Sequence, residues 1–219
     1  MNKPVCLIVG YGSGVGHGVA KAFGSEGYHL ALLARNPQRH APLTAELASA
    51  GHTVAALAAD AGDEGSLTAA IAKVGREIGE PDVLIYNAVV PTFAEPTTLT
   101  TEQLVADFRV NVTGALLAAR LVLPGMKARG RGTILFTGGG WALQPWAGAA
   151  SPSIGKAGLR SLAHTLAQEL ADTGIHVGTV IIAGQVQAGT HFDPDKIAEA
   201  YLQFHRQPPG KFEVEIIYQ

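Results

Sequence analysis

A lysine falls on the apolar side of a predicted helix, where an ammonium group needs a polar partner. Residues 151–159 read SPSIGKAGL, and the helical pattern continues to residue 171. Lys156 shares a face with the apolar stripe of that helix, which consists of Leu159, Ala163, Leu166 and Leu170. Ser151 is a suitable N-cap, and Pro152 suits the first helical position. Because a cation on a buried face is costly without a partner, Lys156 is a candidate functional residue.

A glycine-rich turn follows the first apolar run, VCLIV at residues 5–9. The turn fits the pattern G-x-x-x-G-x-G at Gly10, Gly14 and Gly16, with Val15 between the last two, and does not fit G-x-G-x-x-G. Such glycines let backbone N–H groups approach a pyrophosphate at a helix N-terminus, where the helix dipole favours anions. Glycines also serve tight turns and close packing. The order strand, turn, helix favours a dinucleotide site.

The residue after the second apolar run bears on which dinucleotide would bind. The run at residues 29–34 ends at Arg35, where an NAD site usually carries an acidic residue. The planar guanidinium of Arg35 suits a 2′-phosphate, with Asn36 and Arg39 nearby, although a solvated arginine is the alternative. We therefore predict NADP(H) in preference to NAD(H). Asp60, after the third run, is expected to accept from the adenine amino group or to cap the next helix.

The order of apolar runs and helical patterns predicts the fold. Seven runs are expected as strands, at residues 5–9, 29–34, 53–58, 82–86, 132–137, 176–182 and 212–218. Helical patterns are found near residues 15–26, 41–50, 64–78, 101–129, 152–171 and 194–206. Continuous apolar strands indicate burial on both faces. We predict one α/β domain over residues 1–219, with a seven-stranded, mainly parallel, doubly wound sheet between helical layers, a Rossmann-like arrangement. Ligands of such sheets bind beyond the carboxyl ends of the strands.

Composition narrows the classes of partner. The net charge of −2 gives no reason to expect nucleic acid or an anionic membrane, and no apolar run reaches membrane-spanning length. The single Cys6 excludes an intrachain disulfide and favours a reducing compartment. The eight histidines show no metal-ligand spacing. We expect a soluble cytoplasmic protein that acts on a small molecule.

The motifs, in their order, resemble those of the short-chain dehydrogenase/reductase family over nearly the whole chain. The matching positions are Gly10, Gly14 and Gly16, then Asp60, Asn87-Ala88, Asn111-Val-Thr-Gly, Lys156, and Ala183-Gly184, where the family usually has Pro-Gly. The resemblance implies hydride transfer between a nicotinamide cofactor and a substrate. It assigns catalytic roles to Asn111 and Lys156. It also implies cofactor contacts from Gly10, Gly14, Val15, Gly16, Arg35, Asp60, Asn87, Gly184 and Lys156, whose ammonium would bond the nicotinamide ribose.

Two departures from the family pattern affect the chemistry. The family has a tyrosine four residues before the lysine, and Pro152 stands there; Gly139 stands at the position of the family's serine. Hydride transfer to a carbonyl leaves an alkoxide that must be protonated, and neither residue can donate a proton. General acid catalysis contributes roughly 10²–10⁴-fold to such a rate.

Other groups are candidates for the missing donor, namely the side chains of Ser153, Thr137 and His191 and the backbone N–H groups of Gly138, Gly139 and Gly140. Each also has an ordinary structural explanation as a capping, strand-end, surface or packing residue. Trp141 and Trp146 are expected either to wall a substrate pocket or to pack against a helix. Tyr11, inside the glycine turn, is expected to cover the cofactor.

Two functions remain open at this point. The first is an NADP(H)-dependent oxidoreductase that reduces a small carbonyl or activated alkene with a non-standard proton donor. The alternative is a catalytically inactive NADP(H)-binding protein that acts as a sensor, scaffold or partner subunit. The helices expected at residues 101–129 and 152–171 have more apolar surface than one sheet face needs, so we also expect a homodimer or homotetramer.

Overall fold

The computed structural model describes residues 3–219 and contains one seven-stranded sheet; Met1 and Asn2 of the predicted domain lie outside the described residues. The strand order is β3-β2-β1-β4-β5-β6-β7, and every pairing is parallel. The strands are β1 (Val5–Val9), β2 (His29–Ala34), β3 (Val54–Ala58), β4 (Val83–Tyr86), β5 (Gly132–Gly139), β6 (Ile175–Ile182) and β7 (Glu215–Tyr218). The predicted doubly wound α/β fold is confirmed.

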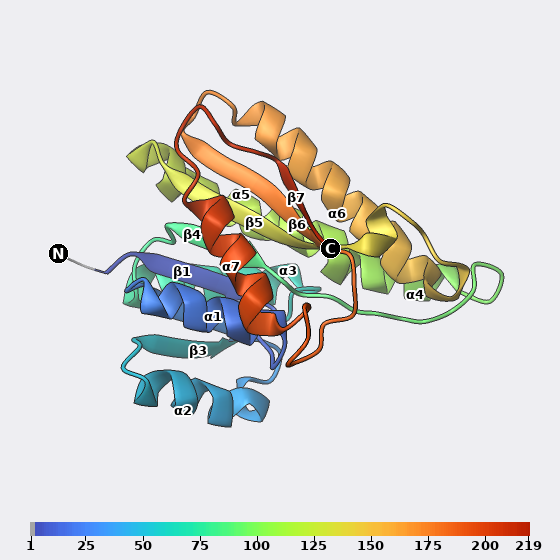
Figure 1. The fold of residues 1–219 in the computed structure, drawn as a ribbon, viewed down its shortest axis with the longest axis horizontal. Coiled ribbons are helices and arrows are strands. Elements are labelled where there is room, and N and C mark those ends of the chain that lie inside the picture. The colour runs from blue at the N-terminus through green and yellow to red at the C-terminus, as the bar shows by residue number, and fades with distance from the viewer. Residues whose placement is uncertain (1–2) are drawn as a thin grey trace.

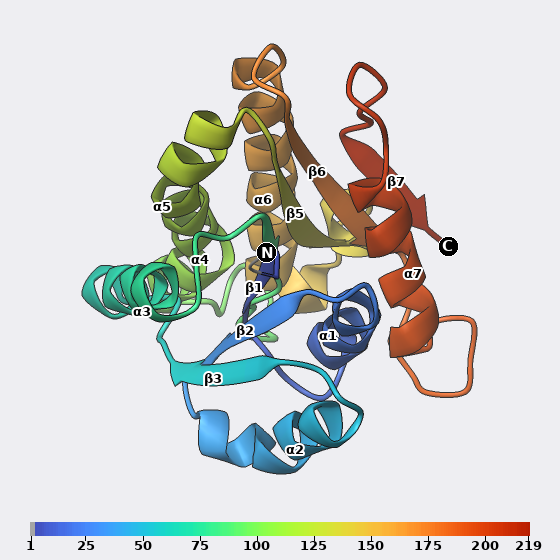
Figure 2. The same ribbon diagram turned by 90° about the vertical axis from the view of Figure 1, so that its left-hand side faces the viewer.

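Helices cover both faces of the sheet (Figures 1 and 2). On one face lie α1 (Val15–Ser25), α2 (Ala41–Ser49) and α7 (Pro194–His205). The other face carries α3 (Glu64–Glu77), α5 (Gly114–Arg129) and α6 (Ala150–Glu169), and α4 (Thr101–Phe108) packs on α6. Within residues 3–219, no helix is both long and apolar enough to cross a membrane.

Alternation along the strands builds two cores, one on each side of the sheet. In β1, Leu7 points into the core shared with α3, α5 and α6, whereas Ile8 points into the core shared with α1 and α7. The aromatic side chains of Phe23 and Tyr201 fill the second core and are fully buried. Burying each large apolar side chain contributes about 1.5–3 kcal/mol. This rigid sheet fixes the positions of the turns at its carboxyl edge.

Two expected helices differ in detail from the prediction. The helix expected over residues 101–129 is divided by a π-helical turn, Arg109–Thr113, between α4 and α5. The helix α6 begins earlier than expected, with Ala149 as its N-cap, so the prediction of Ser151 as the cap is wrong. Ser151 is buried and its Oγ donates to Asp107 Oδ2 at 2.6 Å. Pro152 is the third helical residue rather than the first, still within the turn whose N–H groups have no helical partner.

Candidate active site

The turn between β1 and α1 needs glycine at its start. Gly10 has φ +87°, and a Cβ there would lie 2.3 Å from the backbone N of Ala88. A Cβ on Gly14, the N-cap of α1, would meet nothing within 4 Å, so the backbone is accessible at that point. A Cβ on Gly16 would lie 3.2 Å from Asn87 Nδ2. The first and third glycines therefore permit close packing, and the second leaves space at the helix N-terminus.

Asn87 joins the turns that follow two neighbouring strands. It stands directly after β4, and its Nδ2 donates to the carbonyl oxygen of Gly10 at 2.8 Å. Because β1 and β4 are adjacent and parallel, both turns lie at the carboxyl edge of the sheet. This bond holds the glycine turn in one conformation.

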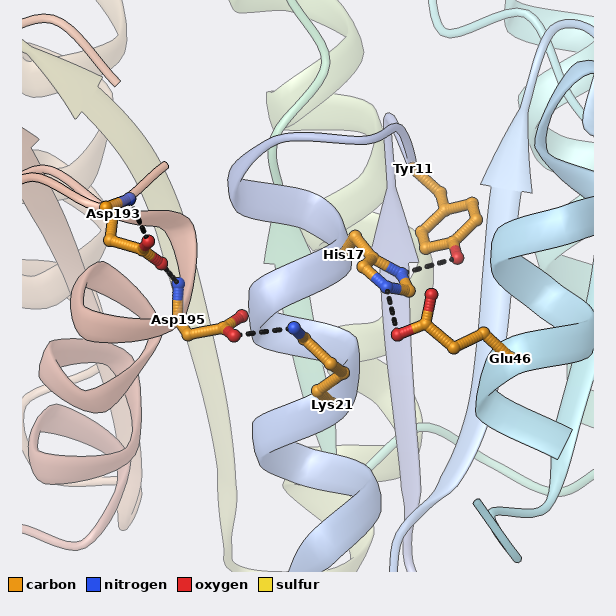
Figure 3. A network of polar contacts seen from close by, with 7 residues as sticks. Tyr11, His17, Lys21, Glu46, Asp193 and Asp195 are labelled. Atoms are coloured by element: carbon orange, nitrogen blue, oxygen red, sulfur yellow. Dashed lines mark hydrogen bonds and ion pairs between the residues drawn. The ribbon is translucent and has the colours of Figure 1, made fainter. Parts of the chain in front are cut away.

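The glycine turn and the helix that follows it are braced from two sides (Figure 3). The hydroxyl of Tyr11 lies 3.0 Å from Nδ1 of His17, whose Nε2 lies 3.4 Å from Glu46 Oε1 on α2. On the other side, Lys21 Nζ donates to Asp195 Oδ2 on α7 at 2.6 Å. Burial raises the pKa of Tyr11 to about 12, so its phenol is neutral at physiological pH.

A cavity of about 560 Å³ lies beyond the carboxyl ends of β1, β2 and β3. Four predicted nucleotide-binding residues line it together: Gly10, Arg35, Asp60 and Asn87. Arg39, His40 and Tyr11 also line it, and Asp60 is the single carboxylate in the lining. Val15 does not line the cavity; its side chain is buried in the core at the start of α1. The exposed Arg35 thus faces a cavity with an excess of positive charge.

Asp60 does not cap the helix that follows it. The N-cap of α3 is Asp63, whose Oδ1 accepts from the backbone N–H of Ser66 at 2.6 Å. Asp60 Oδ1 instead accepts from the N–H of Gly62 at 2.8 Å and closes a local turn. The capping alternative is therefore wrong, and a contact between Asp60 and adenine stays a prediction.

Lys156 lies half-buried below the carboxyl end of β5. Its Nζ donates to the backbone carbonyl oxygen of Thr137 at 2.6 Å. Burial lowers the pKa of Lys156 to about 8, because the surroundings solvate an ammonium less well than water does. The group is mainly cationic at neutral pH and loses its charge in mildly alkaline solution.

Asn111 lies in the π-helical turn and holds the loop after β4. Its Oδ1 accepts from the N–H of Val90 at 2.8 Å, and its Nδ2 donates to the carbonyl oxygen of Val90 at 3.1 Å. A Cβ on Gly155 of α6 would lie 2.9 Å from the Asn111 side chain, so the two helices meet closely there. An irregular turn inside a helix is common at functional sites. The amide of Asn111 is engaged on both its oxygen and its nitrogen, and it positions the loop that lines the nucleotide cavity.

The two positions that depart from the family pattern lie beside Lys156 in sequence or in space. Gly139 ends β5 with φ −161°, an extended conformation open to any residue. A Cβ there would lie 3.4 Å from Lys156 Cε, within reach of ordinary contact. Pro152 is buried in the first turn of α6. The backbone at residues 139 and 152 thus has a regular strand or helix conformation, and neither side chain carries a hydroxyl group.

Two of the candidate donors accept hydrogen bonds from groups elsewhere in the fold. Ser153 is buried, and its Oγ accepts from the backbone N–H of Trp146 at 3.3 Å. Thr137 Oγ1 accepts from the hydroxyl of Tyr201 at 2.8 Å, on the α7 side of the sheet. Both hydroxyls therefore stabilise local structure.

His191 and Gly138 have structural roles of their own. His191 is exposed, stacks on Tyr218, and has its Nε2 3.1 Å from the carbonyl oxygen of Gln219. A Cβ on Gly138 would lie 2.5 Å from a side-chain atom of Ile181. The strand needs glycine there for space.

A second cavity, of about 840 Å³, lies beyond the carboxyl ends of β5 and β6. Trp141 and Trp146 both line it, and Phe93 lines it from the loop after β4; that this cavity takes a substrate stays a prediction. Gly184 belongs to this cavity rather than to the nucleotide cavity. A Cβ on Gly184 would lie 2.1 Å from Phe192 Cζ, so no other residue fits without a shift.

Comparison with known proteins gives the family. The profile described as short chain dehydrogenase matches residues 4–193. The chain belongs to this family. Its similarity to the 2,3-dihydro-2,3-dihydroxybenzoate dehydrogenase of Bacillus subtilis is 30% identity over 176 residues, or 80% of this chain and 67% of that protein. The human dehydrogenase/reductase SDR family member 4 is 28% identical over 174 residues, or 79% and 63%. The chain thus spans about two thirds or less of these two short-chain dehydrogenases.

Solved structures of the family match almost the whole chain. A metagenomic short-chain oxidoreductase in complex with NADP is 27% identical, with a TM-score of 0.90 and coverage of 99% of this chain and 97% of that one. A short-chain dehydrogenase from Rhodopseudomonas palustris is 28% identical, also with a TM-score of 0.90, and is covered to 98%. The fold and the oxidoreductase family membership of this protein are therefore shown.

Phe93 and the amide side chains of the second cavity were missed by sequence reasoning. Phe93 lies in an irregular segment, where no periodicity indicates which way a side chain points. The usable signal was its position, since it follows a strand whose carboxyl end lies at the cleft. Gln144 and Gln185 follow β5 and β6 in the same way.

Proposed function

We propose that this short-chain dehydrogenase is an NADP(H)-dependent oxidoreductase that reduces a small carbonyl compound or activated alkene by hydride transfer, without the family's usual proton donors. One observation supports this most directly. The nucleotide cavity has Gly10 and Asn87 in its wall and a basic rim, and Lys156 is held at the carboxyl end of β5 by the carbonyl oxygen of Thr137, although Pro152 and Gly139 remove both hydroxyls.

The residues present fit a dinucleotide. No Cβ fits at Gly10, so the turn is built for close backbone approach, and the space above Gly14 leaves the N-terminus of α1 accessible to a pyrophosphate. Asn87 fixes the turn through Gly10. Gly10, Gly14 and Gly16 would hold the phosphates, and Lys156 would bond the ribose next to the nicotinamide.

The preference for NADP(H) over NAD(H) rests on the rim of the cavity. Arg35 and Arg39 are exposed there, with His40 beside them. A 2′-phosphate carries up to two negative charges, and an arginine fork can bond two of its oxygens. A ribose without this phosphate would leave the same cations without an anionic ligand.

The chain's own residues would position the reactants and stabilise charge. A bound nicotinamide supplies the hydride. The ammonium of Lys156, fixed by the Thr137 carbonyl, places a positive charge near the carboxyl end of β5. Asn111 holds the loop at Val90, which lines the nucleotide cavity. Since no buried hydroxyl is available at residues 139 and 152, solvent would supply the proton.

We also propose that the protein forms a homodimer or homotetramer. Val105 of α4, Leu116 of α5 and Ile154 of α6 are exposed apolar residues on three of the helices on one side of the sheet. Exposed apolar groups on neighbouring helices favour association. Light scattering is expected to give a multiple of the 22.7 kDa chain mass; a monomeric mass would contradict this.

Titration with NADPH, followed by protein fluorescence, tests the proposed function. We expect NADPH to bind more tightly than NADH and the Lys156→Ala variant to bind it more weakly. Lys73→Ala, which removes an exposed lysine paired with Glu77 on α3, is the matched control and should leave binding unchanged. Failure of both nucleotides to bind would reject the proposal. Binding without turnover of any carbonyl or alkene would favour the inactive NADP(H)-binding protein instead.

A further inference from the structure

The second cavity carries a row of three aromatic side chains. The rings of Phe93 and Trp141 meet edge to face with centroids 5.8 Å apart, and those of Trp141 and Trp146 lie 6.4 Å apart at 28°. Phe93 is 59% exposed and Trp146 56% exposed. Large aromatic surfaces left open in a concave site favour a ligand with an apolar face. The row is long enough to contact a flat, fused ring system.

The lining of this cavity has no ionisable side chain. Its side-chain polar groups are the two indole N–H groups and the amides of Gln144, Gln185 and Gln219. An anionic substrate would lose hydration there without gaining a cationic partner. Amides and indoles can instead donate to the carbonyl oxygens of a neutral molecule. The cavity thus selects for an uncharged ligand with carbonyl groups at the edge of a flat ring.

The missing proton donors restrict the substrate further. Reduction of a simple ketone produces an alkoxide, whose basicity is close to that of hydroxide, with the parent pKa near that of water at about 15.7. Reduction of a quinone produces a phenolate, whose conjugate acid has a pKa of about 10. A phenolate can leave the site and take its proton from water. Of these two products, the phenolate is the better suited to a site with Pro152 and Gly139 at the donor positions.

We propose that the 840 Å³ cavity binds an uncharged quinone, which the protein reduces to the hydroquinone. This inference rests on the proposed function. The quinone gains a hydride from the reduced nicotinamide dinucleotide, whose C–H bond breaks while an O–H bond forms on one quinone oxygen. The electron pair of that hydride becomes the O–H bond. The π electrons of that carbonyl group move into the ring, which becomes aromatic, and the π electrons of the second carbonyl group move onto the second oxygen, which becomes negative. That oxygen takes a proton from water, and the nicotinamide is left oxidised.

Lys156 does not line this cavity but lies behind it, at the strand end that leads into it. Gly140 lines the cavity, and the neighbouring Gly139 lies against the Lys156 side chain. The ammonium, bonded to the carbonyl oxygen of Thr137 on β5, places one positive charge on the strand that leads to a pocket whose lining side chains carry no charge. A developing phenolate is stabilised by that charge, whereas a permanently anionic substrate pays the cost of entering the uncharged lining first.

Calorimetric titration of the nucleotide-free protein with 2-methyl-1,4-naphthoquinone tests the binding step separately from turnover. Cys6 is buried, so thiol addition does not interfere. We expect binding, and weakening of about tenfold or more in Trp141→Leu, because the central ring contact is lost. Phe212→Leu, which removes a ring stacked on His176 in another part of the chain, should bind as the parent does. The charged 1,4-naphthoquinone-2-sulfonate should bind at least tenfold more weakly than the methyl compound.

Turnover with NADPH then separates the quinone from a ketone of the same size. We expect oxidation of NADPH with 2-methyl-1,4-naphthoquinone above the protein-free rate, and a rate with 1-tetralone that is lower by at least about 10²-fold, because the ketone needs the missing general acid. Equal rates with both compounds would overturn the inference, as would the absence of quinone binding in a protein that binds NADPH. In that last case the proposed function would still stand. Failure to bind NADPH, with the quinone bound, would instead reject the proposed function and the reduction step together.

Discussion

The two ends of the cleft have kept different parts of the family pattern. At the nucleotide end, Gly10 has a conformation and a clearance that require glycine, and Asn87 bonds it directly. At the reaction end, Lys156 and Asn111 hold their backbone partners, but the side chains at positions 139 and 152 can neither donate nor accept a proton. The nucleotide end keeps the groups that bind a dinucleotide, whereas the reaction end lacks a side chain that could donate a proton.

This difference separates two tasks that usually occur together in a dehydrogenase. Positioning a hydride donor depends on backbone geometry and on groups that contact the nucleotide. Protonating the product depends on a hydroxyl with a suitable pKa beside the reacting oxygen. The groups that bind the nucleotide can be kept without the proton-donating hydroxyl, provided that the product anion is stable or that no reaction takes place.

Restoring the two hydroxyls should produce the largest effect. In the double variant Gly139→Ser, Pro152→Tyr, we expect reduction of 1-tetralone to rise by roughly 10²–10⁴-fold, the usual contribution of general acid catalysis. The extended backbone of Gly139 and the 3.4 Å clearance to Lys156 accept a serine. Steady-state oxidation of NADPH is the measurement. The variant Gly139→Ala, Pro152→Phe supplies similar bulk without hydroxyls and should show no gain; an equal gain there would mean that shape, not the acid, had been limiting.

Removing the cation at the end of β2 should change the choice of nucleotide. We expect Arg35→Leu to weaken NADPH binding by about 10- to 100-fold, since hydrogen bonds to charged groups contribute roughly 1.5–3 kcal/mol. NADH binding should change little, because NADH has no 2′-phosphate. Fluorescence titration of both nucleotides gives the ratio. Arg76→Leu, an exposed arginine in the last turn of α3, is the control. Equal losses for NADPH and NADH would show that Arg35 does not contact the phosphate.

Deprotonation of Lys156 should weaken nucleotide binding by a smaller factor. Its pKa, lowered by burial to about 8, means that the cation is present below pH 8 and lost above it. We therefore expect NADPH affinity to fall by about tenfold between pH 7 and pH 9.5, the lower end of the contribution of one charged hydrogen bond. Phosphate groups, with a second pKa of about 6, are already ionised throughout that range. Lys156→Met should bind weakly at both pH values, and a persistent slope in this variant would assign the titration to another group.

Much of the fold followed from the sequence, because buried parallel strands require continuous apolar runs. β1 and β2 begin and end where the runs predicted. The division of the helix predicted over residues 101–129 could not be predicted in the same way. Its apolar period continues through residues 109–113, yet Asn111 bonds Val90 from a π-helical turn. That turn depends on a tertiary contact, which the sequence does not display.

The site was predictable where backbone constraints dominate. Gly10 and Asn87 lie together as their motif positions implied, whereas the capping roles assigned to Ser151 and Asp60 were wrong. Both can bond a helix N-terminus or a tertiary partner, and only the fold decides between these partners. Asp107, which receives the Ser151 hydroxyl, comes from a helix 44 positions earlier in the chain.

Acidic solution should lower the stability of the fold through His205, which lies at the edge of the sheet opposite the cleft. His205 lies between the hydroxyls of Tyr28 and Thr133, with its Nε2 and Nδ1 at 2.7 and 2.9 Å. Burial lowers the pKa of His205 from its ordinary value of 6.5, and the neighbouring His176 lowers it further. Above pH 6.5 this histidine is neutral in both the folded and the unfolded chain and contributes no pH dependence. As the pH falls below 6.5, the unfolded chain takes up the proton first, so folding loses stability until the lower folded pKa is reached.

Thermal unfolding between pH 7 and pH 5 measures this loss, at about 1.4 kcal/mol for each unit of pKa difference. We expect His205→Gln to have a shallower decline in melting temperature than the parent protein, whereas the exposed His191→Gln should keep the full decline. An unchanged slope in His205→Gln would show that other groups titrate on unfolding. His205 titrates below pH 6.5, whereas Lys156 titrates near pH 8. A loss of NADPH binding in alkaline solution with an unchanged melting temperature is therefore assigned to Lys156. The same loss accompanied by a fall in melting temperature would show that unfolding, and not the charge of Lys156, weakens the binding.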